Sequence, residues 1–201
     1  MARESQGPGA AGMNTIGALA AGAVAGAAGT TALNAVTYLD MVWRGRPASS
    51  TPDATVRKLA DLTGISIPGT EEERTNRVAG VGPLLGILAG VSVGAALGLL
   101  RGAGYRRGLV GTSLTAVAGA LVVGNGPMTA LGVTDPRTWS RADWLSDVVP
   151  HLAYGIAAGA ALEALDPAPR SVSRRQIVSR RRGGGSTIAL KEGPRFRVAS
   201  Q

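Results

Sequence analysis

The feature that most constrains this chain is the length of its uncharged segments. Three of them run for 35, 23 and 27 residues without a charged side chain, at Ser5–Leu39, Val78–Leu100 and Gly108–Thr134. A fourth, Val148–Leu165, is interrupted only by Glu163. A helix of about 18 or more residues with few or no charges is long enough to cross a bilayer. The chain is therefore predicted to cross a membrane four times.

The composition excludes a water-soluble core of the usual kind. Hydrophobic residues make up 45% of the 201 residues, yet only one of them is Phe, at position 196. Soluble cores of this size draw much of their buried area from aromatic side chains, whereas the apolar content here is Ala, Leu, Val and Gly. The chain has no Cys, which excludes disulfides, thiolate nucleophiles and cysteine-ligated metals.

We predict an all-α integral membrane protein, folded as a four-helix bundle over residues 13–165. A mobile N-terminal arm, residues 1–12, precedes the bundle, and a disordered basic tail, residues 166–201, follows it. The four spans are expected at residues 13–41, 78–101, 108–124 and 144–165. A cleaved signal peptide is the alternative for the first run, but its uncharged stretch exceeds the usual h-region of about 7–15 residues.

The second spanning helix is predicted to begin outside the membrane. Thr70 and Glu73 have the spacing of a capping box, in which each side chain bonds the other residue's backbone N–H. Acidic residues in a first turn also complement the positive end of the helix dipole. We therefore expect this helix to start near Glu71 and to continue to Arg101.

The connecting segments carry further helix signals. Pro52 suits a first helical turn, which predicts a short helix over residues 52–62 that rests on the membrane surface or on the bundle. Ser140 is expected to cap the last helix. Asn125-Gly126-Pro127 is a strong breaker combination, and it predicts that the third helix ends near Gly124.

Glycine recurs at every fourth position of the second span, at Gly82, Gly86, Gly90, Gly94, Gly98 and Gly102. Small residues at matching intervals occur in the first and last spans, at Ala18, Gly22, Gly26, Thr30, Gly155 and Gly159. Helices in a bilayer associate by close packing, which small residues permit. We therefore predict that these glycines form helix-packing seams. A glycine zipper that builds an oligomeric pore is the alternative.

The last span carries the strongest group of ionisable residues. Asp147, His151 and Tyr154 follow at steps of four and three, so they share a helix face, and Glu163 lies about 18 Å further along the axis than His151. Placing an ionisable side chain inside a membrane costs free energy, so such residues are candidates for a function. The function suggested here is a proton or ion relay. The structural alternative is interfacial acids with a histidine that bonds a neighbouring helix. Asn34 in the first span is a further relay candidate, or an interhelical hydrogen-bond partner.

No catalytic motif accompanies these residues, so the protein is predicted to be no enzyme and to need no metal or cofactor. One His without Cys cannot form a zinc site of the usual kind. The tail between residues 170 and 197 holds nine basic residues against one acid, and nucleic acid is not expected as a partner because interleaved aromatic residues are missing. Anionic lipid headgroups are the expected partners of its clusters, at Arg174, Arg175, Arg180, Arg181 and Arg182.

An even number of spans places both termini on one side of the membrane. That side would hold 13 Lys and Arg residues, and the other side would hold 8. Loops rich in Lys and Arg remain in the cytoplasm. Both termini are therefore predicted to be cytoplasmic, in a multi-pass protein of the cell membrane.

Two segments resemble uncharacterised four-helix membrane proteins of high-GC bacteria. They are RGRPASSTPDATVRKLADLTG, residues 44–64, and GVTDPRTWSRADWLSDVVPHLAYG, residues 132–155. More loosely, the layout is similar to the YagU-like inner-membrane family, with a proline-bearing first loop and a histidine early in the last helix. The resemblance implies an inner-membrane location and supplies no catalytic residues.

These observations predict a structural or partner-binding component of the cytoplasmic membrane. Its expected partners are membrane lipids and either another membrane protein or further copies of the chain. The alternative is a small proton-linked transporter or channel that uses the last helix.

Overall fold

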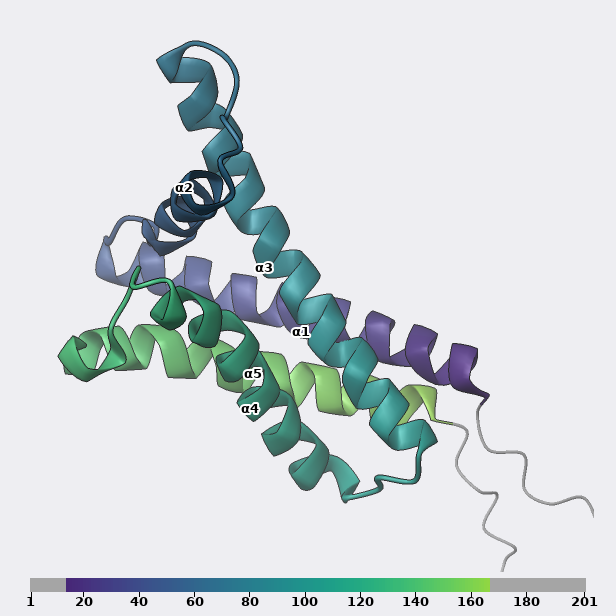
Figure 1. Ribbon diagram of the computed structural model, residues 1–201. Coiled ribbons are helices and arrows are strands. Elements are labelled where there is room, and N and C mark those ends of the chain that lie inside the picture. Colours follow the sequence, from purple (N-terminus) through teal and green to yellow (C-terminus); the bar gives the residue numbers. More distant parts are fainter. Residues whose placement is uncertain (1–13, 167–201) are drawn as a thin grey trace, which may run out of the picture. The chain divides into compact units, whose positions relative to one another are not determined.

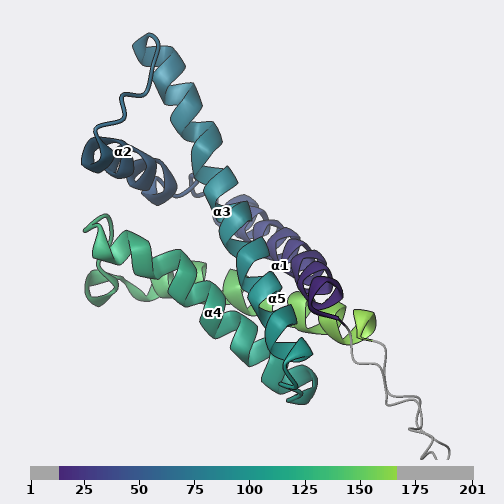
Figure 2. The ribbon, with the colours of Figure 1, turned by 45° about the vertical axis from the view of Figure 1, so that its right-hand side comes forward.

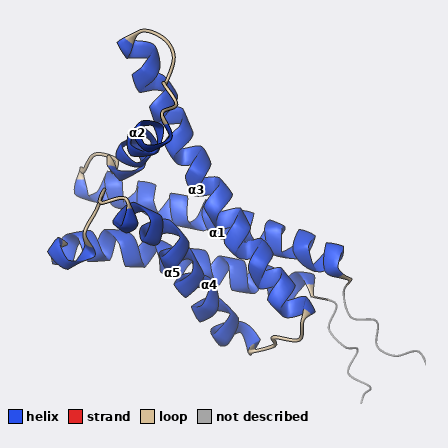
Figure 3. Cartoon of the chain, viewed as in Figure 1, coloured by secondary structure: helices blue, strands red, loops and turns tan. Residues whose placement is uncertain are grey.

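The computed structural model describes residues 14–166. This part of the chain consists of helices and their connections, as predicted (Figure 1). The α-helices are α1 (Thr15–Arg44), α2 (Thr51–Thr63), α3 (Glu71–Gly102), α4 (Gly108–Ala130) and α5 (Arg141–Leu165), and a 3-10 turn, η1 (Pro136–Thr138), precedes α5. No strand occurs among the described residues (Figure 3). The predicted arm and the predicted tail from residue 167 onward, with its five clustered arginines, lie outside them.

Four of the helices are long and apolar enough to cross a membrane. They are α1, α3, α4 and α5, with 30, 32, 23 and 25 residues. About 20 residues suffice for a spanning helix, so each reaches beyond the hydrocarbon core. The remaining helix, α2, has 13 residues and is too short to cross.

Side chains close the N-termini of α3 and α5 as predicted. The Glu73 backbone N–H donates to Thr70 Oγ1, and the Thr70 N–H donates to Glu73 Oε2 at 2.7 Å. Ser140 and Asp143 form the same reciprocal pair at the start of α5. Both pairs satisfy backbone donors that a first helical turn leaves without intrahelical partners.

The predicted end of the third helix near Gly124 is wrong, because α4 continues to Ala130 with Pro127 inside it. A proline removes one backbone donor and does not dissolve the helix around it. In a bilayer the remaining backbone groups have no water to bond instead, so spanning helices tolerate Gly and Pro. The last turn closes where the Leu131 N–H donates to the Pro127 carbonyl oxygen at 2.9 Å.

The four long helices contact one another in a ring. α1 packs against both α3 and α5, α4 packs against α5, and α3 also touches α4. α2 lies outside this ring and packs on α3 alone among its major contacts (Figure 2). The predicted four-helix bundle is confirmed. Its most extensive interfaces are those that α1 forms with α3 and with α5.

Small side chains build the core, which joins all four long helices. Its buried members are Ala25, Val93, Leu97, Ala116, Ala120, Tyr154, Ala158 and Leu162. Large apolar side chains instead face outward: Val110 is 73% exposed and Val122 is 69% exposed. This distribution suits a lipid environment, where close packing rather than removal from water drives helix association.

α3 crosses α1 obliquely, and glycines of both helices occupy the crossing (Figure 1). A Cβ atom placed on Gly26 would lie 2.6 Å from the Gly90 carbonyl oxygen, and one on Gly22 would lie 2.8 Å from the Gly98 Cα. Gly94 lies against backbone atoms of both Gly22 and Gly26. No space for a side chain remains, so the two backbones contact each other directly.

The contact with α1 does not reach the first two glycines of the predicted seam. A Cβ atom on Gly86 would meet no atom of the described residues within 4 Å. On Gly82 its three nearest atoms would belong to Pro52 and Asp53 of α2, the closest at 3.0 Å. The physical reason is the oblique crossing, which holds two helices together for only a few turns before they diverge.

Glycines also allow α5 to approach α4. A Cβ atom on Gly155 would lie 2.6 Å from the Ser113 carbonyl oxygen, and one on Gly159 would lie 3.2 Å from the Ser113 backbone nitrogen. Both α5 glycines are buried. The α4–α5 interface is therefore also a close contact between a glycine face and a neighbouring backbone.

Candidate functional site

Four charged side chains meet where α3 and α5 end. Arg101, in the last turn of α3, donates from Nε to Asp166 Oδ2 and from Nη1 to Glu163 Oε1, both at 2.8 Å. Arg106, in the turn after α3, donates to the same Asp166 carboxylate. These two cations and two anions form one neutral group, which we call the ion cluster.

The centre of the ion cluster is buried. The side chains of Arg101 and Asp166 are 6% and 4% exposed, whereas those of Glu163 and Arg106 are 34% and 45% exposed. Arg101 Nη1 also lies 3.4 Å from Thr112 Oγ1 of α4. Forming a buried ion pair costs desolvation, but removing one partner costs about 3–5 kcal/mol because the other charge stays buried. The cluster therefore ties together the ends of three spans.

Asp166 follows the last residue of α5 and lies outside the spanning segments. Burial raises the pKa of its carboxyl group, but hydrogen bonds from Arg101 and Arg106 together lower it by more, so the net pKa lies below the ordinary value. A carboxylate that accepts bonds from two guanidinium groups stays charged at neutral pH in spite of its burial.

Tyr154 lies in the middle of the bundle and is fully buried. Its hydroxyl donates to the Gly90 carbonyl oxygen of α3 at 2.7 Å. Its ring lies against Gly29 of α1, where an added Cβ atom would come within 2.7 Å of the ring edge. This one α5 side chain thus contacts both α1 and α3, and its hydroxyl group is already used in a hydrogen bond between helices.

A second polar group connects α4 to α5 near the start of α5, and we call it the α4–α5 polar cluster. Asn125 Nδ2 donates to Asp147 Oδ2 at 2.9 Å. His151 Nδ1 lies 2.7 Å from the Asp147 backbone carbonyl oxygen and 3.5 Å from its carboxylate. A neutral His151 that donates from Nδ1 to this carbonyl keeps Nε2 as an acceptor. Nε2 faces Gly124 of α4, 3.6 Å from where a Cβ atom would stand.

Arg44 connects the end of α1 to the start of α5. Its Nη1 donates to Ser146 Oγ at 3.1 Å. Asp40, one turn earlier, pairs with Arg44 and with Arg46. The charged residues that end α1 are thus also paired within the chain.

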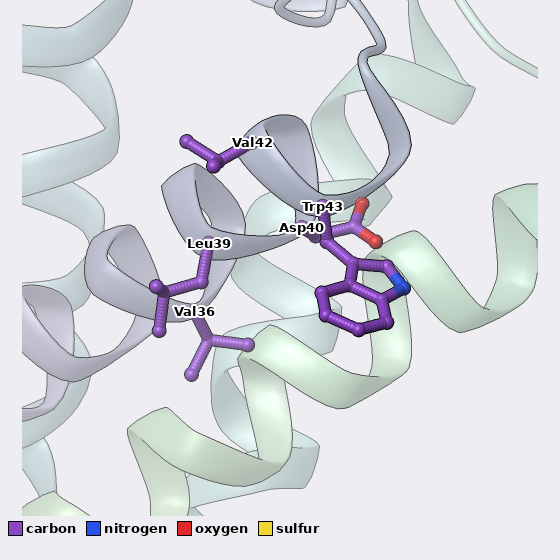
Figure 4. Close-up of a pocket in the computed structure, with 5 residues that line it drawn as sticks. All are labelled: Val36, Leu39, Asp40, Val42 and Trp43. Carbon is purple, nitrogen blue, oxygen red and sulfur yellow. The ribbon is translucent and has the colours of Figure 1, made fainter.

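The surface of α1 next to these residues carries a shallow groove of about 400 Å³. Its lining side chains project from consecutive turns of this one helix (Figure 4), and they are Val36, Leu39, Asp40, Val42 and Trp43. The groove is open, and Trp43 is 91% exposed. An open groove on one helix cannot enclose a small molecule, and tryptophan at this level is typical of the water–lipid boundary.

The residues predicted to form a relay are divided among separate contacts. Asp147 and His151 lie together in the α4–α5 polar cluster, whereas Tyr154 bonds α3 and Glu163 bonds Arg101. Asn34 is half-buried on α1 and takes no part in these hydrogen bonds. The shared helix face exists, but its members contact different neighbouring helices.

Sequence reasoning missed four residues of these groups. It assigned Arg101 to the end of a span, Asn125 to a breaker and Asp166 to the start of the tail, and it gave Arg106 no part in a site. One signal points to the ion cluster, since the second and fourth spans end on the same side of the membrane. A cation that ends one and an acid that ends the other are therefore candidates for a pair.

The buried polar side-chain atoms of the described residues are paired within the chain. Within residues 14–166, no three His, Cys, Asp or Glu side chains are placed to hold a metal ion. Every fully buried side-chain nitrogen or oxygen there has a hydrogen-bond partner. The polar groups described above are therefore interhelical contacts in the first place.

Four apolar spanning helices packed in a ring define the class: a multi-pass integral membrane protein of the helical-bundle type. Comparisons of the chain with protein-family models, curated proteins and solved structures found no match. Its function must therefore be inferred from its own residues.

Proposed function

We propose that this protein is a non-enzymatic structural component of a bacterial cytoplasmic membrane, which holds a fixed helical scaffold and binds a partner membrane protein. The ion cluster is the observation that carries the proposal. Its charges are paired with one another between the ends of α3 and α5, and Arg101 also bonds the Thr112 hydroxyl of α4. Such pairing supports a fixed arrangement of the spans. Apart from Asn34, the relay candidates are already hydrogen-bonded within the protein, which favours a structural role over proton or ion transport.

Partner capture is the experiment that tests this function. The full chain, extracted in mild detergent, would be compared with an unrelated four-helix membrane protein produced at the same level. A membrane protein recovered reproducibly with this chain alone, in stoichiometric amount, supports the proposal. Recovery of the chain with lipids only, or with the same proteins as the control, contradicts partner binding.

Both termini are proposed to face the cytoplasm. The turn between α3 and α4 contains Arg106 and Arg107 on the side of the termini, and the Lys and Arg counts of the two sides favour this orientation. Because the chain has no Cys, single cysteines report sidedness without background. Ala103→Cys should react with a membrane-impermeant maleimide only after the cells are opened, and Ser66→Cys should react in intact cells.

Proton-linked transport is the second candidate, and the His151–Asp147 contact is the observation that favours it. Nε2 of His151 would exchange protons beside Gly124. Proteoliposomes with a trapped pH-sensitive dye test this idea. A proton flux that His151→Ala abolishes, with the thermal stability unchanged, would replace the scaffold proposal, whereas no flux from the native protein contradicts the transport function.

A further inference from the structure

Among the α-helices of residues 14–166, α2 alone is too short to span, and its place in the fold is informative. It lies crosswise beside the N-terminal part of α3 in both views (Figures 1 and 2). The contact involves its first turns: Pro52 lies against Gly82 of α3, and Val56 is 8% exposed. A helix that runs across the spans lies parallel to the membrane surface when the spans cross it.

The contact on α3 lies at the expected water–lipid boundary. Val78, which is fully buried, is the first residue of the 23-residue uncharged run that follows Arg77. Tryptophans are enriched at this boundary, and Trp43 and Trp144 stand at the end of α1 and the start of α5 on the same side. The chain therefore holds α2 at the level of the lipid headgroups.

The apolar face of α2 extends beyond its contact with α3. Leu59 and Leu62 continue the face begun by Val56, yet they are 37% and 63% exposed, and Ile65 just after the helix is 67% exposed. We call these three exposed residues, Leu59, Leu62 and Ile65, the α2 patch. The charged residues Arg57 and Asp61 lie off this face, whereas Lys58, four residues before Leu62, lies at its edge. Segregation of apolar and charged residues around the helix is typical of interfacial helices.

We propose that α2 is a membrane-surface helix, whose patch inserts between the headgroups and acyl chains of the bilayer that the spans cross. The connections to α1 and α3 hold the helix at that depth, and Lys58, at the edge of the inserted face, is placed to reach lipid phosphates. A second copy of the chain is a poorer occupant. Three partly exposed side chains offer much less than the roughly 800 Å² that each partner of a stable protein interface contributes.

Single cysteines in this cysteine-free chain test the proposal. Leu62→Cys and Ile65→Cys would carry an environment-sensitive fluorophore, with Arg57→Cys and Asp61→Cys as matched controls on the opposite face of the same segment. The labelled full chain is reconstituted into vesicles of phosphatidylethanolamine and phosphatidylglycerol. Brominated lipids then quench the fluorophores that lie in the membrane, and iodide quenches those in water.

Quenching by brominated lipid should be at least about twofold stronger at positions 62 and 65 than at 57 and 61, because interfacial helices bury one face only. Iodide should show the reverse order, at every ratio of protein to lipid. Equal iodide quenching at all four positions would overturn the proposal. Protection of positions 62 and 65 that disappears when the protein is diluted in lipid would overturn it too, because a second copy would then be the occupant.

This inference rests on the chain spanning a membrane and not on the scaffold function. Resistance of the protein to extraction by alkaline carbonate reports the spans separately. A protein that resists carbonate while its α2 patch stays in water therefore contradicts the role of α2 alone.

Discussion

Replacing Gly94 by Ala adds one methyl group at the point where the backbones of α1 and α3 touch. The new Cβ atom would lie less than 3.0 Å from three backbone atoms of Gly22 and Gly26. Backbone atoms cannot rotate away, so the helices must separate by roughly 1–2 Å to reach an ordinary carbon contact of about 3.5–4 Å. A gap of about 0.5–1 Å already loses about a quarter to a half of the dispersion energy of a contact, so this separation loses at least that much from each neighbouring contact.

The expected cost is about 1–3 kcal/mol, the usual range for an overpacked interior site. For a domain of roughly 150 residues, this lowers the melting temperature by about 2–12 °C. Gly86→Ala is the matched control, because it makes the same change in the same helix at a site that is open within 4 Å. It should leave stability unchanged or raise it slightly, since Ala is the better helix former.

Unfolding by sodium dodecyl sulfate in mixed micelles, followed by circular dichroism, measures both variants on one scale. Thermal precipitation in a mild detergent gives an independent ranking. If Ala at position 94 is tolerated as well as Ala at position 86, then the crossing is not a close backbone contact and the packing described for α1 and α3 is wrong.

Three further predictions concern the polar contacts of the bundle, and the same denaturation assay measures each of them. Arg101→Met should destabilise the fold by about 3–5 kcal/mol because two carboxylates lose a buried counter-charge, whereas Met at the exposed Arg107 should change stability by less than about 0.5 kcal/mol; equal effects would show that the ion cluster is not formed. The folded-state pKa of Asp166 lies below its ordinary value, so its stabilising contribution is complete above the unfolded-state pKa of about 3.9 and is lost as pH falls through the folded-state pKa. The stability difference between the native protein and Asp166→Asn should accordingly be largest at neutral pH and shrink toward pH values of about 3; a difference that grows on acidification would reverse this assignment. Tyr154→Phe keeps the ring contacts and removes the hydrogen bond to Gly90, so it should cost about 1 kcal/mol, and no measurable loss would mean that this bond does not hold α3 to α5.

Local sequence signals predicted where helices start, but they could not predict contacts between residues far apart in the sequence. The capping box of Thr70 and Glu73 acts within four residues, so its sequence spacing was enough to place the start of α3. The end of α4 was misplaced because the effect of Pro127 depends on whether water can replace the backbone hydrogen bonds of the helix. That depends on whether the segment lies in water or in a bilayer.

The packing seam shows the same limit. Gly86 and Gly94 occupy equivalent positions in the four-residue repeat, but only Gly94 lies at the crossing with α1. The repeat identifies a face of α3 and carries no information about the crossing angle, which decides where the contact ends. Likewise Arg101 and Asp166 are 65 residues apart. The order of the spans puts both residues on one side of the membrane, but it does not show that they pair.

The order of synthesis gives α5 a special place, because every interhelical polar bond described above between the long helices except one involves it. Its Ser146, Asp147 and Tyr154 bond Arg44 of α1, Asn125 of α4 and Gly90 of α3. Glu163 and the adjoining Asp166 pair with Arg101. The exception joins Arg101 to Thr112. A nascent chain that has inserted only the first three spans therefore carries donors and acceptors whose partners are still to come, and these bonds form only once α5 has been inserted.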